Sequence, residues 1–411
     1  MSGARASLAP PADLTVPTLG STTAQQVLSA ALRRLLADLA AGLSPARTPG
    51  GEDALQREVM AAVRGAMAAE PGAMFSVLRR ADVGTWVRCL RPGGGGVADR
   101  AAGVRALGGT LALAMASLGI LPGAIRIGRP PGRLSSLAGR ARVDVPAGAS
   151  AAIVAADRVV FEGVSEGPGE VSLGEVAGRD DAFAPIVGDL VLALVDDNPL
   201  AAVEAHPEKS GNALDLGGEP ASAWVAALAE ALGLVEAQMP ELRREIDLVV
   251  QQVVPVGSSR ERHLSASFQE AIGTVYLSLH PQPLTMVEAL IHEFSHNKLN
   301  ALLEVDPVLE NAFTSLHRSP VRPDPRPLHG LLLAVHAFLP VARFYEALIA
   351  SGDSRGQRPE VRRRFLQIIE GNHEGVAVVA EHGRPTAIGA ALVDELVRLD
   401  RHFVSLAPML A

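Results

Sequence analysis

The chain has 411 residues and a formal net charge of −8; hydrophobic residues make up 48% of it and aromatic residues only 3%. This length suggests two or three domains with ample core, packed mainly by Ala, Val and Leu. The acidic balance, without any basic run, argues against nucleic acid as the main partner. The single cysteine, Cys89, excludes an intramolecular disulfide and a cysteine-rich zinc cluster, and it fits a reducing cytoplasm.

The N-terminus lacks the apolar region of a signal peptide, and residues 1–20, rich in Pro and Ala, are predicted to be disordered. The longest apolar run, residues 106–121, contains paired glycines and stops short of a membrane span. We therefore expect a soluble cytoplasmic protein that makes no use of a membrane.

The hydrophobic pattern predicts a mostly helical α+β fold. Helices are expected at 24–43, 53–69, 74–90 and 101–121, which form a helical N-terminal region over 21–135. Composition then shifts to short Val/Ile-rich runs between Gly, Pro and Asp turns over about 142–216, which predicts a central β-rich segment. A helix at 219–239 and strands at 248–256 and 271–280 follow. The remaining helices are expected at 285–305, 328–350, 359–370 and 386–404.

The rest of the chain is organised around the stretch 285–305. Thr285 and Glu288 have the spacing of a capping box, so we expect the helix to begin there and to end at Asp306-Pro307. His292 and His296 lie four residues apart, so both imidazoles project from one face of this helix, with Glu293 beside them. An unpaired buried imidazole costs free energy, which favours a metal site over two structural histidines. Residues 136–411 are therefore predicted to form a β-strand-containing metal-binding catalytic domain.

A third ligand has to come from elsewhere in the chain. The favoured candidate is His336, in an otherwise apolar part of the 328–350 helix, which we expect to pack against the helix that carries the histidine pair. The alternative for His336 is a core histidine that donates to a backbone carbonyl. His329, at the start of the same helix, is the reserve candidate, or else a cap or supporting residue. The carboxylates of Glu304 and Glu310 are further options.

A proline-rich loop before the 328–350 helix contains Arg322 and Arg326, flanked by prolines at 320, 323, 325 and 327. Prolines stiffen a loop, and a fixed guanidinium suits a carboxylate in bidentate geometry. A protease has little use for rigid arginines beside its metal, whereas an oxygenase with a dicarboxylate cosubstrate needs one. The alternative is a solvated basic loop that forms a salt bridge with Asp324.

The runs SASFQEAIGTVYLSLH, ALIHEFSHNKLNALL and SPVRPDPRPLHGLLLAVHAFLPVARFYEAL, within about 260–350, resemble the HExxH family of peptide-modifying proteins. That family is associated with gene clusters for ribosomally made peptides and is similar to α-ketoglutarate/iron-dependent peptide β-hydroxylases. The resemblance implies that His292 and His296 bind Fe(II) and that Arg322 or Arg326 holds α-ketoglutarate. It also implies a third histidine ligand on the following helix, for which His336 and His329 both stay open.

The first functional hypothesis is therefore an Fe(II)/α-ketoglutarate-dependent oxygenase, a dioxygenase that hydroxylates the β-carbon of a residue in a ribosomally synthesised precursor peptide (RiPP biosynthesis). Glu293 would orient a ligand or a water in that site. Tyr276 and Ser278, which alternate on the preceding strand, would line the peptide groove, or else are ordinary strand residues. The alternatives are a zinc metallopeptidase, in which Glu293 activates a zinc-bound water, and a non-enzymatic peptide-binding protein with a structural metal.

Overall fold

The computed structural model describes residues 11–43, 52–91, 97–202, 205–206, 209–320 and 324–410. The helices are α1 (Thr23–Gly42), α2 (Asp53–Ala69), α3 (Pro71–Leu78), α4 (Ala81–Cys89), α5 (Arg100–Ser117), α6 (Leu173–Val176), α7 (Ala221–Gln238), α8 (Pro240–Val249), α9 (Pro283–Leu303), α10 (Leu328–Ala350), α11 (Pro359–His382) and α12 (Ala387–Leu410). The strands are β1 (Ile125–Gly128), β2 (Arg133–Ser136), β3 (Ala141–Asp144), β4 (Ala151–Val154), β5 (Arg158–Glu162), β6 (Glu170–Ser172), β7 (Phe183–Val187), β8 (Leu190–Ala193), β9 (Ala205–His206), β10 (Lys209–Ser210), β11 (Gln252–Ser258), β12 (Ser265–Ala266), β13 (Thr274–Leu279), β14 (Leu316–His317) and β15 (Arg326–Pro327). The fold is mostly helical α+β, as the sequence predicts.

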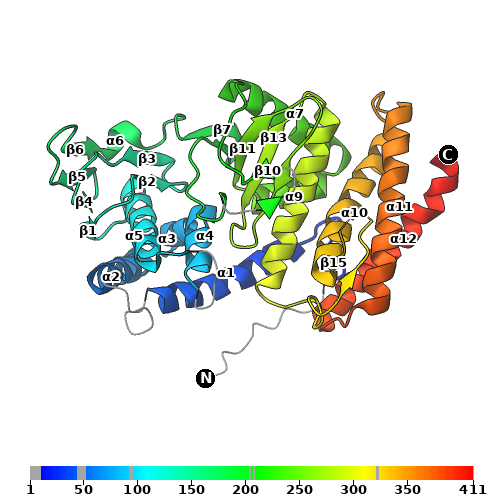
Figure 1. Ribbon diagram of the computed structural model, residues 1–411, viewed down its shortest axis with the longest axis horizontal. Helices are drawn as coiled ribbons and strands as arrows, with labels where there is room; N and C mark the ends of the chain where they lie inside the picture. The colour runs from blue at the N-terminus through cyan, green and yellow to red at the C-terminus, as the bar shows by residue number, and fades with distance from the viewer. Residues whose placement is uncertain are drawn as a thin grey trace.

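The N-terminal part has its own hydrophobic core. Helices α2 and α5 pack against the antiparallel sheet β1-β4-β5-β6, α5 also packs against the β2–β3 hairpin, and α3 and α4 pack on α5. This core extends from Leu35 to Leu173. Figure 1 shows these elements at one end of the molecule. The predicted boundary at residue 135 falls inside this core. The first strands of the β-rich segment thus pack with the N-terminal helices, because their apolar faces are buried against α5.

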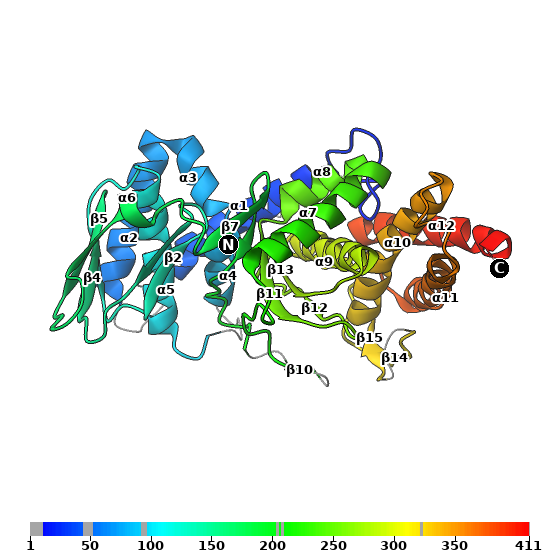
Figure 2. The same ribbon diagram turned by 90° about the horizontal axis from the view of Figure 1, so that it is seen from above.

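The central five-stranded sheet has the order β12-β13-β11-β8-β7, in which β8, β11 and β13 run parallel. Along β13, Val275 and Leu277 belong to the core that α7 and α9 share, whereas Tyr276 belongs to a smaller core that includes Ala81 and Leu137. This alternation follows from the two-residue period of a strand. Helices α7 and α9 therefore cover one face of the sheet, and the N-terminal part approaches the other (Figure 2).

Helices α10, α11 and α12 form the opposite end of the molecule, and α9 packs against α10 as predicted (Figure 1). Among the described residues, α10 alone is long and apolar enough to cross a membrane. Of its most apolar window, 61% is buried within the protein, which is the environment of a core helix in a soluble protein.

The segment 11–20, predicted to be disordered, is ordered against the C-terminal helices. Leu14 is buried in the main core, and the backbone N–H groups of Thr15 and Val16 donate to the Glu395 carboxylate on α12 at 2.9 and 3.0 Å. The prediction was wrong for these residues because composition does not reveal a tertiary contact that satisfies backbone groups. Residues 1–10 lie outside the described part of the chain.

Three further elements differ from the predictions. The helix expected over 359–370 continues to His382 as α11. The helix expected over 74–90 is two helices, α3 and α4, and Pro240 begins the short helix α8 instead of ending the preceding helix as a breaker. Proline is well placed at the first position of a helix, where its missing N–H has no intrahelical partner to lose.

Candidate metal centre

Helix α9 carries the histidine pair and begins two residues earlier than expected. Its first residue is Pro283, and Gln282 precedes it as a cap residue without a side-chain hydrogen bond, so the predicted capping box of Thr285 and Glu288 is wrong. The carboxylate of Glu288 is used elsewhere. It accepts hydrogen bonds from the Tyr345 hydroxyl of α10 and from the Arg364 guanidinium of α11, at 2.7 Å from Nη2. Glu288 therefore fixes α9 to the two helices beside it.

The imidazoles of His292 and His296 lie together on one face of α9, with ring centroids 4.4 Å apart and planes at 82°. Neither ring makes a hydrogen bond with any described residue, and Nδ1 of His296 is buried without a partner. Burial, together with the nearby His296 and Arg364, lowers the pKa of His292 well below its ordinary value, and burial also lowers the pKa of His296. Both rings are therefore neutral at physiological pH, as metal ligation requires.

Glu293 lies with these imidazoles. One carboxylate oxygen and one ring nitrogen from each histidine all lie within 4.8 Å of one another, and no other group of this kind occurs among the described residues. The Ser267 hydroxyl donates to Oε2 of Glu293 at 2.7 Å, and the Asn297 amide donates to Oγ of Ser267 at 3.1 Å. Asn297 is itself fixed by the backbone N–H of Gly273, 2.6 Å from its Oδ1. The buried carboxylate is thus held in one orientation.

These residues line an open cavity of about 370 Å³, which we call the imidazole cavity. Its opposite wall comes from the start of α10 and the loop before it, and includes Arg326, His329 and Phe338. The Phe338 ring packs edge-on against His292, 4.6 Å between centroids. The Arg326 guanidinium lies against Gly330, since a Cβ added there would meet Nε of Arg326 at 3.3 Å. Glycine at 330 therefore leaves room for a guanidinium at the wall.

His336, the favoured third ligand, is not part of this wall. It is buried, and its Nε2 lies 3.2 Å from the carbonyl oxygen of Leu14. The geometry is that of the alternative considered for it, a core histidine bonded to a backbone carbonyl. The reserve candidate His329 lines the cavity with His292 and His296. Glu304 is also engaged elsewhere, because Arg91 binds its carboxylate.

Of the two arginines, Arg326 lines the cavity, and Arg322 lies outside the described residues. Arg326 forms an ion pair with Asp324 at 3.4 Å, as the alternative for this loop expected, yet its side chain stays 39% exposed. Such a pair at the surface contributes little to stability, so the guanidinium can bind a ligand carboxylate in the cavity.

Tyr276 and Ser278, predicted to line the peptide groove or else to be ordinary strand residues, do not line the imidazole cavity. Both are buried in β13, and Tyr276 points to the sheet face opposite α9. Its hydroxyl donates to Oδ2 of Asp196 at 3.0 Å, while Ser278 accepts from the backbone N–H of Leu264 at 2.7 Å. Both are strand residues with satisfied polar groups.

Sequence reasoning overlooked Ser267 and Asn300. Asn300 is 5% exposed, lines the cavity, and its amide has no partner among the described residues. A signal for Asn300 was present, because residues 292, 296 and 300 share one helical face. Ser267 lies in an irregular stretch, and only the tertiary fold brings it to Glu293.

The donor set fits a divalent transition metal. Two neutral imidazoles one turn apart, a buried ring nitrogen without a partner and an open wall with a third imidazole match the ligands that Fe(II) and Zn²⁺ take in proteins. His292 and His296 would hold such an ion, and His329 lines the same cavity without belonging to the group whose donor atoms lie within 4.8 Å of one another. No model of a known protein family matches the chain, and no curated protein is significantly similar to it.

Proposed function

We propose that the protein is an Fe(II)/α-ketoglutarate-dependent oxygenase that hydroxylates a side chain of a ribosomally synthesised peptide in the cytoplasm. The observation that carries the proposal is the presence of Arg326 in the same cavity as His292 and His296. A guanidinium in the same cavity as a metal site suits the distal carboxylate of a dicarboxylate cosubstrate. The resemblance of residues 260–350 to HExxH peptide β-hydroxylases supports the same reading.

In this proposal each cavity residue has a separate task. His292, His296 and His329 hold the iron, which supplies the oxidative chemistry when bound. Arg326 binds the carboxylate of α-ketoglutarate, and the unpartnered amide of Asn300 offers it a further donor. Phe338 keeps the His292 ring in place and excludes water from that side. Glu293, held by Ser267, orients a ligand or a water.

The test needs no knowledge of the peptide. The full chain is loaded with Fe(II) without oxygen and titrated with α-ketoglutarate, and a weak visible charge-transfer band is expected. Arg326→Ala is expected to remove the band, while Arg362→Ala on the exposed side of α11 leaves it unchanged. On admission of oxygen in the presence of ascorbate, which reduces the second oxygen atom to water in place of the peptide, slow conversion of α-ketoglutarate to succinate and CO₂ is expected. Absence of both the band and succinate contradicts the proposal.

One observation favours zinc-dependent peptide hydrolysis as a second candidate. The Glu293 carboxylate lies within 4.8 Å of both imidazoles, where a carboxylate can take a proton from a metal-bound water. Glu293→Gln separates the two candidates. It abolishes peptide cleavage by the zinc-loaded protein if the second is correct, whereas α-ketoglutarate binding to the iron-loaded protein survives the change if the first is correct.

A further inference from the structure

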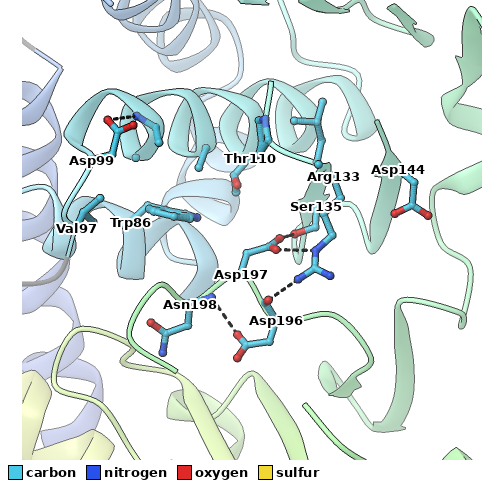
Figure 3. Close-up of a pocket in the computed structure, with 16 residues that line it drawn as sticks. Trp86, Val97, Asp99, Thr110, Arg133, Ser135, Asp144, Asp196, Asp197 and Asn198 are labelled. Carbon is cyan, nitrogen blue, oxygen red and sulfur yellow. Dashed lines mark hydrogen bonds and ion pairs between the residues drawn. The ribbon is translucent and has the colours of Figure 1, made fainter. Parts of the chain in front are cut away.

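A second cavity, of about 620 Å³, lies between the N-terminal part and the central sheet (Figure 3). Its walls come from α4, α5, β2 and the segment 196–198 that follows β8. We call it the acidic cavity, because it contains four carboxylates, those of Asp99, Asp144, Asp196 and Asp197. It belongs to the opposite face of the sheet from α9, since Asp196 and Asn198 both bond the Tyr276 hydroxyl.

The four carboxylates differ in how they are neutralised. Asp197 forms an ion pair with Arg133 at 2.7 Å, Asp144 pairs with Arg142 at 2.8 Å, and Asp99 lies 3.9 Å from Arg105. The Asp196 carboxylate accepts only from neutral donors, the Tyr276 hydroxyl and the backbone N–H of Asn198, and it has no ion pair within the described part of the chain. The Arg133 guanidinium donates instead to the backbone carbonyl of Asp196. A half-buried carboxylate without an ion pair is costly when its surroundings exclude water.

A second, independent feature points to a ligand. Thr110 lies on the α5 wall and is 5% exposed, yet its hydroxyl has no hydrogen-bond partner among the described residues. The half-buried indole of Trp86, from α4, likewise makes no hydrogen bond with them. Figure 3 shows both side chains directed towards the 196–198 segment across the cavity. Polar groups left without partners at such depth usually meet a ligand or water.

The spacing of the carboxylates excludes a simple metal site. Among the described residues, only His292, Glu293 and His296 gather tightly enough to hold an ion, and no carboxylate of the acidic cavity belongs to such a group. Carboxylates spread over a wide cavity suit a cation with several donors. An aromatic face beside them adds a favourable contact for a guanidinium or an ammonium group.

We propose that the acidic cavity binds a cationic side chain, arginine or lysine, of the peptide on which the protein acts. This side chain belongs to a part of the peptide other than the segment that enters the imidazole cavity. The identity of the partner as a peptide rests on the proposed function. Asp196 is the counter-ion of the bound cation, Trp86 covers its apolar stem, and Thr110 bonds its donor groups or the adjacent backbone. Ala102, Gly103 and Ala106 on the same wall leave room for an extended chain.

The test measures binding by calorimetry with the full chain in EDTA, so that its result is independent of any metal or catalysis. The probes are acetyl-Ala-Arg-Ala-amide and the same peptide with citrulline, which keeps the shape and removes the charge. The arginine peptide is expected to bind at least about tenfold more tightly than the citrulline peptide. Asp196→Asn is expected to weaken the arginine peptide about tenfold, and Thr110→Val about threefold.

The matched control is Asp189→Asn, which removes a carboxylate that is 71% exposed and lies outside the cavity, and which is expected to leave binding unchanged. If Asp196→Asn fails to fold, the comparison with the citrulline peptide and the Thr110→Val variant still test whether the acidic cavity binds the cation. Equal binding of the arginine and citrulline peptides, or no heat at millimolar peptide, overturns the proposal. Free L-arginine amide binding as tightly as the tripeptide overturns the assignment to a peptide.

Discussion

The imidazole cavity and the acidic cavity both contain buried polar groups without a protein partner, but they differ in how those groups are spaced. In the imidazole cavity, two ring nitrogens and a carboxylate oxygen converge within 4.8 Å, the arrangement that a single ion requires. In the acidic cavity, the carboxylates are dispersed over three segments and do not converge. Spacing therefore separates a metal site from a site for an extended cation, although both would attract positive charge.

The largest effect is expected from substitutions that disrupt the convergent arrangement of the imidazole cavity. His292→Ala and His296→Ala each remove one of two imidazoles on a single face of α9, so affinity for Fe(II) or Zn²⁺ is expected to fall by more than about 100-fold. Metal content after dialysis and a competitive chelator titration measure the loss. The control is His263→Ala, which removes a nearby imidazole that does not line the cavity. Unchanged metal content in both single variants contradicts the metal centre.

The next effect concerns the acidic cavity and depends on pH. Burial raises the pKa of Asp196 to about 6 from its ordinary value of 3.8. The folded protein thus binds more protons than the unfolded chain between those values, and its stability falls as pH rises through that window. Relative to Asp196→Asn, the wild-type protein is expected to lose at most about 3 kcal/mol between pH 4 and pH 7. Urea unfolding of both proteins at several pH values provides the comparison; parallel profiles contradict the assignment.

Two histidine substitutions on α10 test which of its histidines belongs to the metal site of the imidazole cavity. His329→Ala is expected to lower metal affinity about 10- to 100-fold with little change in stability, because His329 lines the cavity. His336→Leu is expected to leave metal affinity unchanged and to lower the free energy of unfolding by about 1–3 kcal/mol, because it leaves the Leu14 carbonyl without its partner. The reverse pattern would restore His336 as the third ligand.

The smallest effect tests how Glu293 is held. Ser267→Ala removes the hydroxyl that donates to its carboxylate at 2.7 Å, and stability is expected to fall by about 1 kcal/mol. The turnover rate is expected to fall severalfold more than α-ketoglutarate affinity does, because the carboxylate loses its fixed orientation. Ser265→Ala, at the same cavity wall, is the control. Equal losses for both variants would mean that Ser267 has no positioning role.

The sequence predicted those features that depend on local periodicity. Helix α10 begins and ends at the predicted residues, and the shared face of His292 and His296 follows from the pitch of the α-helix. What failed depended on contacts between distant segments. His336 looked like a ligand because its partner, the carbonyl of Leu14, lies 322 residues away in sequence. Ser267 and the acidic cavity could not be predicted for the same reason, because the residues involved have no characteristic spacing in the sequence.

The N-terminal segment 11–20 has a practical consequence for work on this protein. It connects α9, α10 and α12 through Lys298, His336 and Glu395, which bond the backbone of residues 13 to 16. Trimming the chain to begin at residue 11 keeps every one of these bonds. Trimming it to begin at residue 21 removes them and exposes the side chains of Lys298, His336 and Glu395 that the segment covers. An affinity tag or fusion partner at this end therefore needs a spacer ahead of Asp13, so that residues 13 to 16 can keep their hydrogen bonds to the three helices.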